Sequence, residues 1–152
     1  MRTLLIVSTL VVSAPTAPDT HALACQGEIF GTSVHFGETI VKTFALPNQI
    51  FVLSESEATI LRAMPLRREF ENVCEIENSG RLIEFTPNSV HAKWTSSEDW
   101  ETKTSCHFAF NRSLGTATLT TRYEWSEHRS SQSEWRMSCV PTAVPVYNRK
   151  IR

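Results

Sequence analysis

The chain has 152 residues, which is enough for one domain and too few for two ordinary ones. Hydrophobic residues make up 41% of it and charged residues 20%, with 5 glycines and 7 prolines. This composition is typical of a folding chain and excludes collagenous, coiled-coil and wholly disordered classes. With 15 basic and 16 acidic residues the net charge is −1, so no overall field would recruit nucleic acid or acidic lipid.

The first residues have the pattern of a secretory signal. Arg2 precedes an apolar run that begins at Leu4 and is too short for the roughly 20 residues of a membrane span. Ala22-Leu23-Ala24 then has the small-x-small spacing that a signal peptidase recognises. The sequence therefore predicts a cleaved signal over residues 1–24 and an exported protein, periplasmic or secreted. The alternative for this segment is a buried N-terminal strand.

Cys25 would be the first residue after that cleavage, as in a bacterial lipoprotein whose cysteine carries lipid. Such signals usually have leucine three places before the cysteine, where this chain has Ala22. A lipid anchor on Cys25 is therefore the minor alternative to a soluble mature chain.

The chain has four cysteines, Cys25, Cys74, Cys106 and Cys139. An even number in an exported protein favours two disulfides, because that compartment is oxidising. The spacings contain no C-x-x-C, which argues against a zinc ribbon or a thioredoxin-type redox site. Three pairings are open. We favour Cys25 with Cys139, which would tie the two ends together, and Cys74 with Cys106.

The segment before residue 70 has mixed signals. Glu28–Phe36 and Thr39–Phe44 are candidate strands. Residues 49–53 and 58–64 are rich in β-branched side chains and favour a hairpin across residues 54–57. The alternative is a short helix over residues 55–63, because Ser54-x-x-Glu57 matches a capping box and Pro65 would end a helix.

From residue 70 onward, apolar side chains recur at every second position, which is the period of a strand. Turn-forming stretches at residues 77–80, 86–88, 95–99, 111–115 and 126–131 separate the strands. We expect an all-β fold, an antiparallel meander closing into a small barrel or barrel-like sheet with two disulfides. No repeat or linker divides the chain, so residues 25–140 are expected to form one domain and residues 141–152 a C-terminal tail.

Recognisable catalytic motifs are missing from the sequence, which has no G-x-S-x-G, no H-E-x-x-H and no glycine-rich phosphate loop. Asp99 would be the only aspartate left after cleavage, which argues against aspartate-rich calcium or magnesium loops. His91 and His107 fall on polar strand faces, and a metal site from them with Glu101 is the minor alternative. We expect no cofactor, no metal and no catalysis.

Tryptophans and threonines share one face of the predicted strands. Core packing is the default for Trp94, Trp100, Trp125 and Trp135. A packed core would seldom collect several hydroxyls, whereas a small barrel with an amphiphilic mouth would. These residues predict a shallow ligand pocket lined by Trp100, Thr102, Thr104, Thr121 and Tyr123. His128 and Arg129, in the turn at residues 126–131, are candidates for contact with a partner, and a solvated loop is the plain alternative.

Two stretches resemble small exported bacterial β-proteins without an assigned activity. They are Phe85-Thr86-Pro87-Asn88-Ser89-Val90 up to Trp94, and Phe110-Asn111-Arg112-x-x-Gly115 followed by an alternating strand and a terminal cysteine. The resemblance implies bacterial export and a meander, and it transfers no catalytic or binding residue.

Three functions follow as hypotheses. The first is non-catalytic binding of a protein or envelope component, with a flat closed core and charged loops. The second is a carrier of a small amphiphilic ligand, with an open cavity beneath Trp100 and Tyr123. The third is a hydrolase with an unrecognised site, which would need His, Glu and Ser side chains converging in a cleft.

Overall fold

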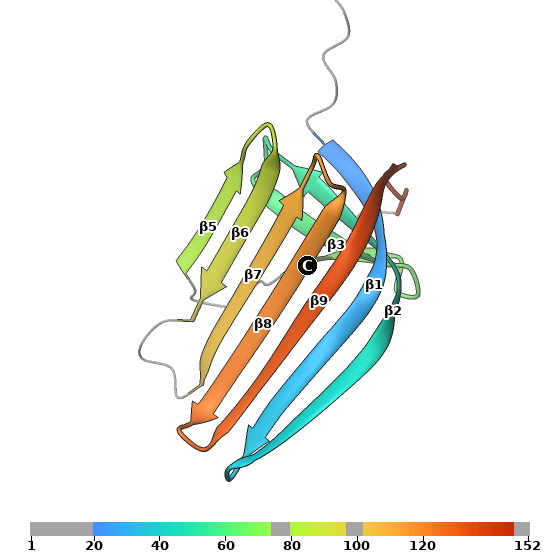
Figure 1. The fold of residues 1–152 in the computed structure, drawn as a ribbon. Helices are drawn as coiled ribbons and strands as arrows, with labels where there is room; N and C mark the ends of the chain where they lie inside the picture. The colour runs from blue at the N-terminus through green and yellow to red at the C-terminus, as the bar shows by residue number, and fades with distance from the viewer. Residues whose placement is uncertain (1–19, 74–79, 97–101, 148–152) are drawn as a thin grey trace, which may run out of the picture.

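The computed structural model describes residues 20–73, 80–96 and 102–147, and these residues form one antiparallel sheet of nine strands. The spatial order is β4-β3-β2-β1-β9-β8-β7-β6-β5, and the sheet curls into a half-barrel (Figure 1). The expected all-β antiparallel meander is thereby confirmed. The strands are β1 (Thr20–His35), β2 (Glu38–Ser54), β3 (Thr59–Met64), β4 (Glu69–Asn72), β5 (Gly80–Phe85), β6 (Ser89–Thr95), β7 (Lys103–Asn111), β8 (Thr116–Ser126) and β9 (Arg129–Thr142).

The hairpin predicted before residue 64 is confirmed, and the alternative helix is wrong. β2 ends at Ser54 and β3 begins at Thr59, and the two strands pair from Ser54↔Thr59 to Phe51↔Arg62. The Ser54 hydroxyl accepts a hydrogen bond from the Glu57 backbone N–H at 3.4 Å. The contact that suggested a helix cap therefore stabilises the turn of a hairpin.

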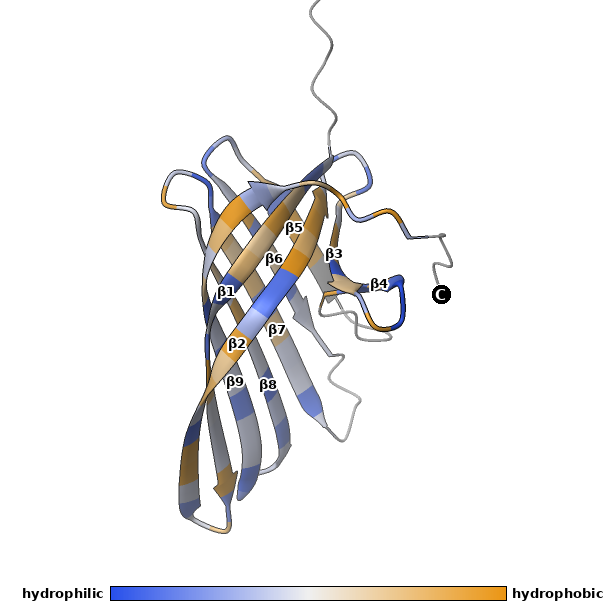
Figure 2. Ribbon diagram, turned by 90° about the vertical axis from the view of Figure 1, so that its right-hand side faces the viewer, coloured by the Kyte–Doolittle hydropathy of each residue, from blue (hydrophilic) through white to orange (hydrophobic). Residues whose placement is uncertain are grey.

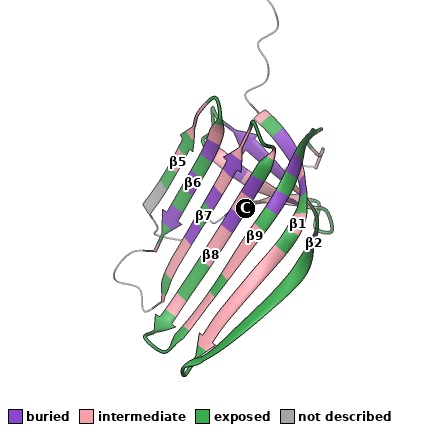
Figure 3. Ribbon diagram, in the orientation of Figure 1, coloured by how far each residue is buried: buried purple, intermediate pink, exposed green. Residues whose placement is uncertain are grey.

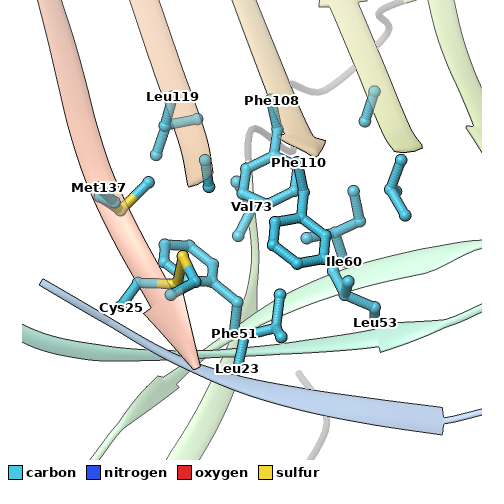
Figure 4. Packing of buried hydrophobic residues seen from close by; sticks show 14 of the residues in the cluster. Leu23, Cys25, Phe51, Leu53, Ile60, Val73, Phe108, Phe110, Leu119 and Met137 are labelled. Carbon is cyan, nitrogen blue, oxygen red and sulfur yellow. A yellow bond between two sulfur atoms is a disulfide. The ribbon is translucent and has the colours of Figure 1, made fainter. Parts of the chain in front are cut away.

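The hydrophobic core fills one end of the half-barrel, which is the upper end in Figure 3. Side chains from both halves of the sheet meet there, and the rings of Phe51 and Phe108 lie 5.4 Å apart (Figure 4). Figure 2 shows apolar residues of β1, β2 and β3 at this end, and β2 also has apolar residues in its other half, where Ile40, Val41 and Phe44 are exposed. The largest fully buried side chains are Phe51, Phe108, Leu53, Ile60, Val90 and Cys25.

The first described strand begins before the expected cleavage point. Ala22 and Leu23 pair with both β2 and β9, and they are only 4% and 5% exposed. Cleavage before Cys25 would remove these core residues, whereas a cut before Thr20 would keep β1 intact. Residues 1–19 of the expected signal lie outside the described residues.

The C-terminal end continues the sheet further than the expected tail boundary. β9 extends to Thr142, and the segment that follows crosses toward β4 (Figure 2). The rings of Tyr147 and Phe70 lie 5.0 Å apart. Tyr147 therefore contacts β4, whereas Val144 and Val146 are 42% and 91% exposed, and residues 148–152 lie outside the described residues.

A disulfide joins Cys25 and Cys139, as predicted. The two residues face each other directly on β1 and β9, with their Cα atoms 4.1 Å apart. Because the Cys25 sulfur is bonded to Cys139, it is not available for the thioether of a lipid anchor. Cys106 is disulfide-bonded as well, while its expected partner Cys74 lies outside the described residues.

Removing the Cys25–Cys139 bond should destabilise the fold. The bond links residues 114 positions apart, and in the chain-entropy model a loop of that size is worth roughly 4–5 kcal/mol. We expect Cys25→Ala/Cys139→Ala to lower the free energy of unfolding by about that amount in urea titrations. A loss below about 1 kcal/mol would contradict the assigned role of this bond.

Gly27 lies at a register shift between β1 and β2, where the backbone of β9 comes very close. A Cβ atom there would overlap the carbonyl oxygen of Arg136 and lie 2.9 Å from its carbonyl carbon. At Gly31 a Cβ atom would meet only the Lys42 carbonyl oxygen, at 3.7 Å. Glycine is therefore required sterically at position 27 and not at position 31.

This difference gives a matched pair of variants. Gly27→Ala should lower the free energy of unfolding by about 1–3 kcal/mol, the usual cost of forcing extra atoms into packed structure. Gly31→Ala should change it by less than about 0.5 kcal/mol. Urea unfolding of both variants measures the difference, and equal effects would show that Arg136 moves away freely.

Candidate functional site

The inner face of the half-barrel changes character from the core end to the open end. Along β8 the inward residues are Leu119, then Thr121, then Tyr123. Their partners on β9 are Trp135, Ser133 and Ser131. The register therefore builds an apolar layer next to the core, then a layer of hydroxyls, and then an aromatic residue at the opening.

A cavity of about 610 Å³ lies on this face, between the β3–β4 hairpin and strands β7, β8 and β9. Both sides of the curled sheet contribute to it, because β3 and β4 face the other strands across the interior. Its lining residues are Arg62, Arg67, Glu69, Phe70, Glu71, Asn72, Val73, Thr104, Cys106, Leu119, Thr121, Tyr123, Ser133 and Trp135.

The structure brings three of the five predicted pocket residues into this cavity, namely Thr104, Thr121 and Tyr123. Thr102 is not among the lining residues, and Trp100 lies outside the described residues. The alternation along β7 and β8 was sufficient to find these three, because residues on one strand face repeat at every second position.

Sequence reasoning missed the lining residues that come from β3, β4 and β9. Arg62 and Glu71 belong to short strands whose register with each other, Arg62↔Glu71, cannot be read from the sequence. Trp135 was assigned to core packing, and it packs against the core from one side while lining the cavity from the other. Trp125 is 43% exposed, so core packing is wrong for this residue, because it lies beyond the end of the core.

Two hydroxyls in the middle of the cavity bond to each other. Thr121 Oγ1 and Ser133 Oγ are 2.7 Å apart and belong to directly opposed residues of β8 and β9. A hydroxyl has one donor and two acceptor positions, so each retains capacity for a further hydrogen bond. This layer therefore offers uncharged hydrogen-bonding groups to anything in the cavity.

Arg62 lies where the β3–β4 hairpin meets the opposite wall. Its guanidinium forms an ion pair with Glu71, and it also lies over the ring of Trp135, 5.4 Å from the centroid. The side chain of Arg62 is 25% exposed and that of Glu71 is 37% exposed. These contacts connect the two walls of the cavity through one charged group and one aromatic ring.

The turn with the predicted partner-contact residues lies next to the cavity opening. The guanidinium of Arg129 lies 5.2 Å from the centroid of the Trp125 ring, and Trp125 stacks on Tyr123 at 6.0 Å. The His128 carbonyl accepts a hydrogen bond from the Phe36 backbone N–H at 3.0 Å. This bond joins the tip of the β8–β9 hairpin to the tip of the β1–β2 hairpin.

His91 and His107 come together on the outer face, which the sequence alone could not show. Their rings stack with centroids 6.1 Å apart. Burial lowers the pKa of His107, and the nearby charges of His91 and Lys93 lower that pKa further. Within the described part of the chain, no group of three or more His, Cys, Asp or Glu residues is arranged to hold a metal ion.

Comparisons with known proteins add no assignment. No protein-family model matches the chain, and no curated protein matches it. In the described ranges there is no helix with the length and apolar character of a membrane span.

The lowered pKa of His107 predicts a pH dependence of stability. The unfolded chain takes up a proton near the ordinary value of 6.5, while folded His107 resists protonation. The contribution of neutral His107 to the free energy of unfolding should therefore be fully present above about pH 6.5. It should be lost as the pH falls from that value toward the lowered pKa of the folded state. Urea unfolding between about pH 8 and pH 5 should show this loss, and His107→Gln should make it smaller.

His128→Gln is the matched control for this prediction, because His128 lies at an exposed hairpin tip. It should keep the pH dependence of the unmodified protein. If His107→Gln shows the same dependence as well, His107 is not its source.

Proposed function

We propose that the protein binds a small amphiphilic ligand, without catalysis, in the cavity of the half-barrel. The observation that carries this proposal is the cavity of about 610 Å³ beneath Tyr123. Pockets for small molecules commonly have volumes of about 300–1,000 Å³. Such pockets combine apolar and aromatic side chains with polar groups that orient the ligand. This lining has both kinds, and polar and charged residues are the majority of it.

The layers of the cavity match the two parts of an amphiphile. Leu119 and Val73 at the inner end are 6% and 5% exposed and belong to the core cluster. Thr104, Thr121 and Ser133 follow toward the opening. An apolar group would contact the inner layer, and a hydrogen-bonding group would reach the hydroxyls.

The core end of the half-barrel is closed and the other end is open. Phe51 and Phe108 are fully buried and fill the interior beyond the cavity. A ligand would therefore enter from the side of Tyr123, which is 41% exposed. Non-catalytic binding of a protein or envelope component through the charged loops is the other hypothesis, and it does not use this cavity.

The cysteines support export as part of this proposal. Cys25 and Cys139 are bonded to each other, and disulfides persist mainly in oxidising compartments. The carrier we propose acts in the periplasm or outside the cell. The absence of histidine from the described lining residues makes the hydrolase alternative less well supported, because it lacks an imidazole base there.

Octyl glucoside below its micelle concentration is a suitable first probe for the proposed cavity. Trp135 lines the cavity, so binding should cause a saturable change in tryptophan fluorescence. Thr121→Phe should weaken the affinity at least about tenfold, because the ring would occupy the middle of the cavity. Thermal unfolding of each variant checks that the fold is retained.

Thr120→Phe is the matched control, since it makes the same change on the opposite face of the same strand. Thr120 does not line the cavity and pairs with His107 and Glu134. It should keep the affinity within about twofold. No saturable response in the unmodified protein, or equal losses in both variants, would refute binding in the cavity.

A further inference from the structure

The charges at the cavity cancel one another. Its lining has four charged side chains, and each lies in an ion pair. Arg62 pairs with Glu71, and Arg67 pairs with Glu69 at 3.6 Å. The described lining therefore has no net charge to attract an ionic ligand of either sign.

Arg62 is held more firmly than Arg67. Its guanidinium contacts the Glu71 carboxylate and also lies over the Trp135 ring. The Arg62 side chain is 25% exposed, compared with 67% for Arg67. An anionic ligand would have to displace Glu71 from Arg62, which exchanges one ion pair for another and adds the cost of removing the ligand charge from water.

The hydroxyl groups of the cavity can bind a ligand without breaking an ion pair. Thr121 and Ser133 bond to each other and each keeps a further hydrogen-bonding position. An uncharged group with hydroxyls of its own can use these positions without the desolvation cost of a charge.

We propose that the cavity selects an amphiphile with an uncharged, hydroxyl-bearing head group, and that Glu71 is the residue that sets this preference. The inference rests on the proposed function and adds the chemical class of the ligand. Glu71 acts by neutralising Arg62. The preference therefore has two sources: Glu71 weakens the binding of anions, and the hydroxyl groups bind an uncharged head group.

Replacement of Glu71 by glutamine tests this role directly. The amide keeps the size of the side chain and removes its charge, so Arg62 is left as an unpaired cation at the cavity. The preference should then change toward anions.

The experiment compares octyl glucoside, octyl sulfate and octyltrimethylammonium, which share one tail and differ in head-group charge. In the unmodified protein, octyl glucoside should bind at least about tenfold more tightly than the two ions. In Glu71→Gln, affinity for octyl sulfate should rise about tenfold or more and decrease again with added salt. The quantity compared is the ratio of the affinities for octyl sulfate and octyl glucoside, which should rise at least about tenfold in Glu71→Gln.

Glu124→Gln is the matched control. Glu124 pairs with Arg122 at 2.6 Å on the same sheet, and neither residue lines the cavity. This variant should leave all three affinities unchanged. Arg62→Gln/Glu71→Gln should lose the gain for octyl sulfate, because the cation that provides the gain is removed.

The outcomes separate the two proposals. If the unmodified protein binds none of the three probes, the proposed function fails. If it binds octyl sulfate as tightly as octyl glucoside, or if Glu71→Gln brings no gain for octyl sulfate, the inference about charge fails while ligand binding stands.

Discussion

Pairing between the first and last described strands is the constraint on which the rest of the structure depends. β1 and β9 pair from Ala22↔Thr142 to His35↔Arg129, and the Cys25–Cys139 disulfide fixes their register near the core. This pairing places both strands in the middle of the sheet. The edges are then β4 and β5, which are neighbours in sequence, so the sheet curls with these two strands at its borders (Figure 1).

The same register determines what the interior contains. Ile29, Trp135 and Leu119 lie in one row across β1, β9 and β8, and Gly31, Ser133 and Thr121 lie in the next. A shift by one residue would turn every inward side chain outward. The disulfide and the tight contact at Gly27 both oppose such a shift, so the elements that stabilise the fold also keep Trp135 and the hydroxyls at the cavity.

Local patterns in the sequence predicted local structure well. The alternation of apolar and polar residues predicted the strands after residue 80, and it assigned Thr104, Thr121 and Tyr123 to one face. The motif Ser54-x-x-Glu57 indicated a turn, although the helix that it also suggested was wrong. Contacts between the two sides of the curled sheet could not be predicted from the sequence, because Arg62 contacts Trp135 only when the sheet has curled. The stacking of His91 on His107 likewise depends on strand register, which alternation does not provide.

The hydroxyl layer has a structural reason of its own. β3 pairs with β2 only from Phe51 to Ser54, so the open halves of β1, β2, β8 and β9 extend past the core. A wholly apolar inner face there would be exposed to water. Ser33, Ser131 and Ser133 reduce that exposure, although Phe44 and Ile40 of β2, which pair with Ile29 and Ser33, are still 55% and 48% exposed. The hydroxyl groups on their own would make this surface compatible with water without forming a binding site. The site arises where the β3–β4 hairpin lies against this surface, because there Arg62, paired with Glu71, lies over the Trp135 ring and the hairpin forms a second wall of the partly open cavity.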